Sequence, residues 1–397
     1  MKKVLRCGTL FSAQDKTVKK DMAVVVDGEK IAEVMPWASF TGTDVEVIDL
    51  SDKFVTPGLI DMHAHVVMDG QVDPFNEMLY TTHGASTIEG IFRAQRDLLA
   101  GFTTIRDCGG CRTGDALAIR DAIRAGKIDG PRMVASGPFL VTTAAANLYE
   151  DGAWIFDGPD EARRAARKAV ASGVDQLKHL GIGHVTLEEM KALVEVARDT
   201  NKIIAIHATD KLTIRKAAEA GPTTIEHGNE IDEESLEWMI RNGTALIPTF
   251  CPYYFCAEHA EDVLHRTPEM AAATRRRYEI HASHLPWLMK SGLTIGFGAD
   301  TGATLTKHGK QAFEMELMHR NGMPEADILY AATATNARLL RLESEIGTIE
   351  AGKCADIAAF AGDPLKDIRL MQDCKFVMRN GHVYKNDGAA SKLKPAL

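Results

Sequence analysis

Short apolar runs alternate with longer amphipathic stretches through most of the chain, and glycine or polar residues separate them. In the stretch 187–200 the apolar residues recur at helical spacing, and Thr186 with Glu188 and Glu189 behind it is typical of a helix start. The short apolar runs have the length of buried strands. We therefore predict eight strands, each followed by a helix: residues 55–65, 103–107, 132–137, 176–180, 203–208, 223–227, 245–249 and 294–300.

Eight strand–helix units over roughly 280 residues predict a (β/α)8 barrel of the TIM type, which is an α/β fold. The alternative is a doubly wound open sheet, which usually carries a glycine-rich phosphate turn after its first strand. Here the first strand ends instead in His63-Ala-His65. Functional groups of a barrel stand where its strands end, so this histidine pair favours the barrel.

The two ends of the chain have a different pattern, made of short strands and turns. Residues 21–34 alternate into an apolar run and turn at Asp27-Gly28, which is typical of a hairpin. Further strands are predicted at 356–360 and 376–384. We expect one small composite β domain from residues 1–56 and 343–397, beside a barrel of residues 57–342.

Composition and charge exclude several classes of protein. The chain has 397 residues, of which 45% are hydrophobic and 25% charged, and 46 basic against 55 acidic residues give a net charge of −9. No basic cluster indicates a nucleic-acid surface. No apolar run approaches the ~20 residues of a membrane span, and the first residues lack the apolar core of a signal peptide. We expect a small-molecule substrate, with neither a nucleic-acid nor a membrane partner.

The cysteines indicate a reducing compartment. Seven cysteines, an odd number, are scattered along the chain, which fits a cytoplasmic protein better than a disulfide framework. Cys108-Gly-Gly-Cys111 has the spacing of a redox pair or of half a zinc site. No second C-x-x-C exists and Gly-Gly suits a turn, so we interpret this segment as a turn.

Candidate metal ligands stand at or near the ends of several predicted strands. His63 and His65 are two residues apart on a strand, so both side chains point the same way and can hold one ion. Four more polar residues recur on later strands and converge with the pair at the mouth of a barrel. Imidazole and carboxylate suit Zn²⁺, and also Mn²⁺, Co²⁺ or Fe²⁺. The candidate ligands are His63, His65, Lys178, His207, His227 and Asp300.

Lys178 decides between one metal ion and two. A buried lysine beside metal is expected to be neutral, and a neutral amine can add CO2 to form a carbamate that bridges two ions about 3.5–4 Å apart. The alternative is a surface or salt-bridged lysine. In the two-metal interpretation a bridging hydroxide attacks the substrate, and Asp300 acts as general base and then general acid.

Several segments resemble the amidohydrolase superfamily, namely 55–65 (VTPGLIDMHAH), 101–107 (GFTTIRD), 225–228 (IEHG), 298–301 (GADT) and 347–356 (GTIEAGKCAD). The chain is most similar to the imidazolonepropionase-like branch, which contains prolidase-type and Xaa-Arg dipeptidases and ochratoxin-hydrolysing amidases. The resemblance implies a binuclear centre, with His63, His65 and Asp300 around one metal, His207 and His227 around the other, and Lys178 bridging. It also implies a β-sandwich formed by the two termini and a homo-oligomer.

The substrate pocket departs from that resemblance. Relatives carry a histidine-containing loop after the third strand, whereas residues 136–147 of this chain contain none. His184 is a candidate for the missing polarising or proton-donating group, or a loop histidine facing water. A tyrosine that often follows the His-Gly of the sixth strand is replaced by Asn229-Glu230. Weaker candidates for substrate contact are Arg112, Tyr149, Asn229, Tyr253 and Lys307.

The favoured function is a metal-dependent amidohydrolase of the dipeptidase or carboxypeptidase kind, which cleaves an amide bond in a dipeptide or an N-acyl amino acid. The same centre could instead open a cyclic amide, a lactone or a phosphoester, and the motifs do not separate these. A non-catalytic metal-binding protein is the remaining alternative. It fits less well, because a structural zinc site closes at four ligands, whereas six candidates are present here.

Overall fold

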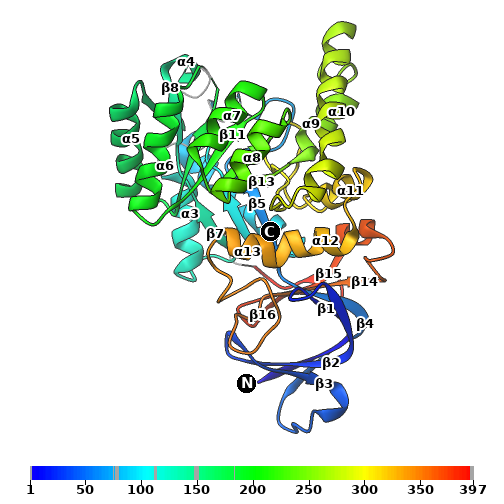
Figure 1. Ribbon diagram of the computed structural model, residues 1–397. Coiled ribbons are helices and arrows are strands. Elements are labelled where there is room, and N and C mark those ends of the chain that lie inside the picture. Colours follow the sequence, from blue (N-terminus) through cyan, green and yellow to red (C-terminus); the bar gives the residue numbers. More distant parts are fainter. Residues whose placement is uncertain are drawn as a thin grey trace.

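The computed structural model describes residues 2–393 apart from 75, 77–79, 111–113, 147–151 and 183. It is an α/β barrel with a smaller, separate β-sheet beneath it (Figure 1). No helix in these described ranges is long and apolar enough to cross a membrane.

Both ends of the chain contribute to the small sheet. It has eight strands, in the order β17-β16-β15-β14-β4-β1-β2-β3. β4 lies at its centre, parallel to β1 and antiparallel to β14, and so joins the N-terminal half to the C-terminal half. The strands are β1 (Lys3–Ser12), β2 (Thr17–Asp27), β3 (Lys30–Pro36), β4 (Glu46–Pro57), β14 (Ile357–Ala361), β15 (Cys374–Arg379), β16 (His382–Asn386) and β17 (Ala389–Ala390).

The small sheet curls around an apolar core of its own. Ile31 of β3, at one edge, shares this core with Leu5 of β1 and with Met378 of β15, near the other edge. Residues so far apart in the strand order can meet only if the sheet bends back on itself. The expected sandwich is therefore built from one continuous sheet, whose two halves face each other across the core.

The barrel strands form two parallel arcs. One has the order β5-β6-β7 and the other β13-β12-β11-β10-β8-β9. The amide of Asp175 donates to Ala135 O at 2.8 Å and joins β7 to the chain entering β10. The strands are β5 (Leu59–Ala64), β6 (Phe102–Asp107), β7 (Arg132–Ala135), β8 (Phe139–Thr142), β9 (Ala153–Phe156), β10 (Gln176–Leu180), β11 (Ile203–Ala208), β12 (Thr224–His227) and β13 (Ala245–Ile247).

Three parts of the strand prediction differ from the structure. The third predicted strand is followed by two strands that were not predicted, β8 and β9, before the helix α5. The run 55–65 is divided at Gly58, so that β4 belongs to the small sheet and β5 to the barrel. There is no room for a β-carbon at Gly58, because it would lie 2.1 Å from the Thr103 hydroxyl. The eighth predicted strand, 294–300, closes the barrel through single bridges, Leu246 to Ile295 and Ala64 to Thr301.

Helices surround the barrel and bury its outer face. The predicted helix 187–200 is α6, and Thr186 and Glu189 form a reciprocal capping box at its start. Helices α5, α6, α7 and α8 follow one another around the green side of the barrel in Figure 1, and α9 and α10 stand at its edge. The helices are α2 (His83–Leu99), α3 (Asp115–Arg124), α4 (Thr143–Ala146), α5 (Pro159–Ala171), α6 (Leu187–Asp199), α7 (Lys211–Ala220), α8 (Glu233–Asn242), α9 (Phe250–Glu258), α10 (Pro268–Lys290), α11 (Phe313–Arg320), α12 (Glu325–Tyr330) and α13 (Asn336–Leu339).

Buried side chains supply the hydrogen bonds that the irregular eighth segment lacks. The Asn336 amide donates to the carbonyls of Ile60 and Phe297, each at 2.8 Å, and accepts from the Phe297 amide. The Asp61 carboxylate accepts from the amides of His63 at 3.0 Å and Ala299 at 3.1 Å, and from the Thr301 hydroxyl at 3.0 Å. These two side chains fasten β5 to the segment that closes the barrel.

Replacing Asp61 by alanine should destabilise the barrel more than replacing it by asparagine. Alanine leaves two buried amides and a hydroxyl without an acceptor, which costs about 3 kcal/mol of unfolding free energy or more. Asparagine keeps one carbonyl oxygen that can accept from both amides. Urea unfolding of the metal-free proteins measures the difference, and equal stability of the two variants would contradict this role of Asp61.

Candidate metal centre

The predicted ligands line a cavity at the carboxyl ends of the barrel strands. The cavity has a volume of about 580 Å³. Apolar side chains of β8, α9 and α10 and two cationic side chains form its outer wall. All six predicted ligands are among its lining residues: His63, His65, Lys178, His207, His227 and Asp300.

His63, His65 and Asp300 form one end of the site. Oδ1 of Asp300 lies 3.5 Å from Nε2 of His63 and 3.1 Å from Nε2 of His65. The two imidazole rings are tilted, with centroids 5.2 Å apart. Two ring nitrogens and one carboxylate oxygen therefore face a common point, as the two-residue spacing of the histidines at the end of β5 predicts.

Lys178 connects this end to the other pair of histidines. Its side chain is 1% exposed, and Nζ lies 3.4 Å from Nε2 of His63. The ring of His227 lies 5.1 Å from that of His63 and 4.3 Å from that of His207. The structure thus brings together all six predicted ligands, which come from five different parts of the barrel.

The hydrogen bonds of three histidines leave one nitrogen of each free to bind a metal. Nδ1 of His63 bonds Glu226 at 2.7 Å, and Nδ1 of His65 bonds the Gly109 carbonyl at 2.6 Å. Nδ1 of His227 bonds the Thr249 hydroxyl, which donates its own proton to the Pro248 carbonyl. Each Nδ1 therefore donates, and each Nε2 carries the lone pair that a metal needs.

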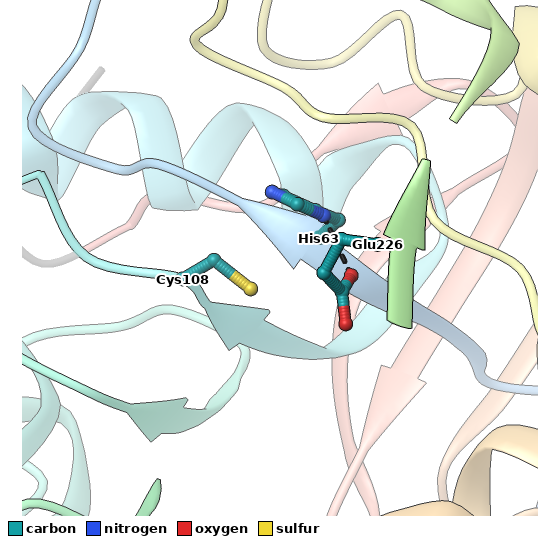
Figure 2. A group of neighbouring side chains, drawn as sticks. All are labelled: His63, Cys108 and Glu226. Carbon is teal, nitrogen blue, oxygen red and sulfur yellow. Dashed lines mark hydrogen bonds and ion pairs between the residues drawn. The ribbon is translucent and has the colours of Figure 1, made fainter. Parts of the chain in front are cut away.

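A second cluster, of His63, Cys108 and Glu226, also has metal-ligand atoms within reach of one another. Figure 2 shows that the Glu226 carboxylate is engaged by His63, with the Cys108 thiol beside them. The other oxygen of Glu226 pairs with the buried Arg106 guanidinium at 2.6 Å. Burial raises the pKa of Cys108 to about 12, so its thiol stays protonated. This cluster supports His63 from behind and does not itself suit a metal.

Burial keeps three of the histidines neutral, and neighbouring groups keep the carboxylate charged. Burial lowers the pKa of His63 to about 4 and that of His207 to about 3. Burial and the neighbouring His207 lower the pKa of His227 well below its usual value. Burial would raise the pKa of Asp300, but His63, His65 and Lys178 outweigh it and hold the value at about 2. Neutral imidazoles and an ionised carboxylate are the forms that bind divalent metal.

Three residues at the same strand ends have a strained backbone. His227, Thr249 and Asp300 have φ angles of +73°, +51° and +57°, in the left-handed region that non-glycine residues rarely adopt. Two of them are predicted ligands, and the third orients His227. Strain of this kind persists where the surrounding structure imposes it, and it is commonly found at functional sites.

The donor set fits metal ions by a test that the structure itself supplies. Oδ1 of Asp300 is buried and makes no geometrically acceptable hydrogen bond to a described residue, although Nε2 of His65 lies 3.1 Å away. With Nδ1 of His65 donating to Gly109 O, its Nε2 has no proton to donate. Burying a carboxylate oxygen without a partner costs free energy unless a cation binds it. A metal ion shared with the histidines would be such a cation.

The other predicted contacts have mixed outcomes. Tyr253 lines the cavity, and Asn229 is buried near it. His184 and Lys307 are exposed, and neither is among the lining side chains. The structure therefore does not bring either side chain to the predicted ligands. Arg112 and Tyr149 lie outside the described residues.

Some residues of the site were not predicted. Glu226 precedes His227 on β12 and points inward beneath the metal ligands, but its sequence neighbours do not reveal its bond to His63. Arg266, just before α10, and Arg277, within α10, line the outer cavity. Burial, with the charge of Asp300, raises the pKa of Tyr253 well above its usual value, so its phenol keeps its proton.

Sequence comparison identifies relatives along most of the chain. Ochratoxinase of Aspergillus niger is 29% identical over 378 residues, which cover 84% of this chain and 76% of the relative. Imidazolonepropionase of Rhizorhabdus wittichii is 25% identical over 379 residues, covering 86% of this chain and 88% of the relative.

Solved structures have the same fold. A crystal structure of a Xaa-Pro dipeptidase with methionine bound in its active site matches with a TM-score of 0.89 and 30% identity, covering 97% of this chain and 100% of that one. The A. niger ochratoxinase structure matches with a TM-score of 0.85 and 24% identity, covering 100% of this chain and 98% of that one.

The sequence profile of the Amidohydrolase family matches residues 54–384, from β4 to β16. That range includes all six predicted ligands. The chain therefore belongs to the amidohydrolase family.

Proposed function

We propose that this protein is a binuclear metal-dependent hydrolase that cleaves the amide bond of a small carboxylate-bearing molecule, such as a dipeptide or an N-acyl amino acid. The observation that carries the proposal is the buried Lys178, whose amine stands among neutral histidines and opposite the unsatisfied Asp300 oxygen. A site for one metal needs no lysine at this position.

Each ligand has a defined part in this proposal. His63, His65 and Asp300 would hold one ion, His207 and His227 the other, and Lys178 would bridge them as a carbamate. The carbamate forms when neutral Nζ bonds to the carbon of CO2 and loses a proton. Zinc suits this set of imidazole and carboxylate ligands, and Mn²⁺, Co²⁺ and Fe²⁺ share the preference. The bound ions would supply a Lewis acid and an activated water.

Asp300 is placed to move the proton. Its low pKa keeps it ionised at neutral pH, and its side chain lines the cavity. In the proposed reaction the carboxylate oxygen that does not bind metal takes the proton from the attacking water and returns it to the leaving nitrogen. The protonated phenol of Tyr253 supplies a hydrogen-bond donor to the substrate from the neighbouring wall.

The outer cavity favours an anionic substrate with an apolar part. Beyond the ligands, its charged lining residues are Arg266 and Arg277. Arginine binds carboxylates in a bidentate manner, and no second acidic residue competes with the substrate among the described lining residues. Met68, Phe139 and Ile182 provide an apolar wall. The names of two similar proteins, ochratoxinase and a Xaa-Pro dipeptidase, agree with this substrate class.

A cyclic amide is the second candidate substrate. It rests on the similarity to imidazolonepropionase, whose identity to this chain is 25%. The two candidates differ in what leaves the site, because hydrolysis of a ring amide releases one product and hydrolysis of a linear amide releases two. Assays of amine release and of ring opening therefore separate them.

The proposed reaction is tested by incubating the metal-supplemented protein in bicarbonate with dipeptides and N-acyl amino acids and measuring amine release. We expect release by the wild type and two divalent ions per chain. Lys178→Ala should retain at most one ion and lose at least about 100-fold in kcat/KM, because the bridging ligand is gone.

Two further samples control for this result. Lys178→Arg keeps a cation but cannot add CO2, so it should also be inactive. Added acetate should partly restore Lys178→Ala by supplying a free carboxylate to the vacated space. Full metal content and activity in Lys178→Ala would refute the bridging role, and a fully metallated wild type that releases no amine would redirect the search to cyclic amides, lactones and phosphoesters.

The carboxylate preference predicts a selective defect in an Arg277→Gln variant. Its KM for N-acyl amino acids should rise about tenfold, because a charge-assisted hydrogen bond is lost. KM for the matching N-acyl amino acid amides, which have no carboxylate, should not change. Arg276→Gln is the matched control, since Arg276 neighbours Arg277 on α10 and does not line the cavity. An equal effect on both substrates would assign Arg277 a structural role.

A further inference from the structure

A second cavity lies at the opposite end of the barrel from the metal centre. Its volume is about 450 Å³. Arg132 at the start of β7, Ile203 at the start of β11 and Asp175 just before β10 line it. Metal ligands occupy the other ends of these arcs. Arg379 of β15 brings the small sheet to the same cavity, which therefore lies between the two parts of the molecule.

The lining of this second cavity is strongly basic. Among the described residues it contains five arginines and one acidic residue, Asp175, and we call it the basic pocket. Its arginines are Arg120, Arg124, Arg132, Arg341 and Arg379.

Two of the five arginines have short contacts to carboxylates. Arg120 pairs with Asp175 at 2.8 Å and Asp121 at 2.9 Å, and donates to Gly173 O. Arg132 pairs with the buried Asp356 at 2.6 Å and donates to Asn380 at 3.1 Å. These contacts hold the two arginines in place, and they occupy the carboxylates of Asp121, Asp175 and Asp356.

The other three arginines have weaker or neutral partners. Arg124 is 63% exposed and has only longer contacts, 3.4 Å and 3.9 Å, to the carboxylates that Arg120 also binds. Arg341 donates to the side-chain oxygen of Asn201, which carries no charge. Arg379 donates to the Gly130 carbonyl, and its Nε is buried without a hydrogen-bond partner in the described structure.

Arg379 is buried beside another cation of the pocket. Burial, together with the neighbouring charge of Arg132, lowers the pKa of Arg379 below its usual value. Like charges are thus held close together in a partly dehydrated space, where the repulsion is largest. An anion in the pocket would relieve the repulsion.

We propose that the basic pocket binds a small oxyanion with at least two negative charges, in the form of a phosphate monoester or a dicarboxylate. Guanidinium groups bind both kinds of oxyanion through paired hydrogen bonds. The pocket is large enough for a molecule of the size of a nucleoside monophosphate. A ligand there would contact Arg341 of the barrel and Arg379 of the small sheet together, so its binding should also stabilise the junction between them.

The test titrates the metal-loaded full-length protein with 5′-AMP, inorganic phosphate and succinate by calorimetry, in a buffer of low ionic strength without other multivalent anions. We expect saturable binding at one site per chain, weakened by added salt. 5′-AMP and phosphate test for a phosphate ligand, and succinate for a dicarboxylate. The protein should also melt at a higher temperature with the bound anion.

The variant Arg124→Gln/Arg341→Asn removes two exposed charges and preserves the fold, because glutamine suits a helix and asparagine tolerates the left-handed φ of +60° at position 341. Its affinity for the bound anion should fall by about tenfold or more. Arg164→Gln, which alters an exposed arginine of α5 outside the pocket, should bind as the wild type does.

Two results would overturn the proposal. One is the absence of saturable binding by all three anions. The other is equal binding by the wild type and the double variant, which would place the anion elsewhere, for example at the metal centre. Neither result bears on amide hydrolysis, which the Lys178 variants test separately.

Discussion

The metal centre depends on a buried ionic chain that crosses the barrel interior from Arg106 through Glu226 to His63. Neither Arg106 nor Glu226 has any exposed side-chain surface, and their closest contact is 2.6 Å. Burial would raise the pKa of Glu226, but Arg106 and His63 hold it well below its usual value, so the carboxylate stays charged. An ion pair in such surroundings is stable only when every donor and acceptor is satisfied. Arg106 meets this condition through Thr224, Glu226 and the Met62 carbonyl.

This chain also explains the orientation of the first ligand. Glu226 accepts from Nδ1 of His63 and so directs Nε2 toward Lys178 and Asp300. Gly109 O and Thr249 do the same for His65 and His227. The centre is therefore organised from outside inward, by groups that never touch a substrate. Such supporting contacts commonly tune metal affinity as strongly as the choice of some ligands does.

The two ends of the barrel have opposite designs. At the carboxyl ends of the strands, neutral histidines and one carboxylate converge on a cavity that fits cations. At the other ends, arginines from the barrel and the small sheet converge on a cavity that fits anions. The two parts also share an apolar core, and the buried pair of Arg132 with Asp356 joins them beside it. The proposed anion binding and the proposed hydrolysis would therefore use separate surfaces.

Local pattern predicted the fold well. Strands such as β10 and β11 match their predicted bounds, since strand periodicity depends only on neighbours in the sequence. The irregular form of the segment 294–300 could not be predicted in the same way. Two of its backbone amides bond the side chains of Asp61 and Asn336 where a regular strand would bond its neighbour, and such bonds leave no periodic pattern in the sequence. The sequence also did not reveal that the expected sandwich is one curled sheet, because the curl depends on which distant residues share a core.

The sequence by itself determined the chemistry of the ligands and the strands that carry them, because a histidine two residues from another, or at a strand end, is a local fact. Only the tertiary structure decided which groups support them and which groups line the outer cavity. His184 and Lys307 are close in sequence to predicted ligands, but their side chains are exposed. Arg266 and Arg277 are far from most of the ligands in sequence, yet they line the cavity from α10 and the residues just before it. Glu226 is 163 residues from His63 along the chain, and their contact exists only because the barrel closes.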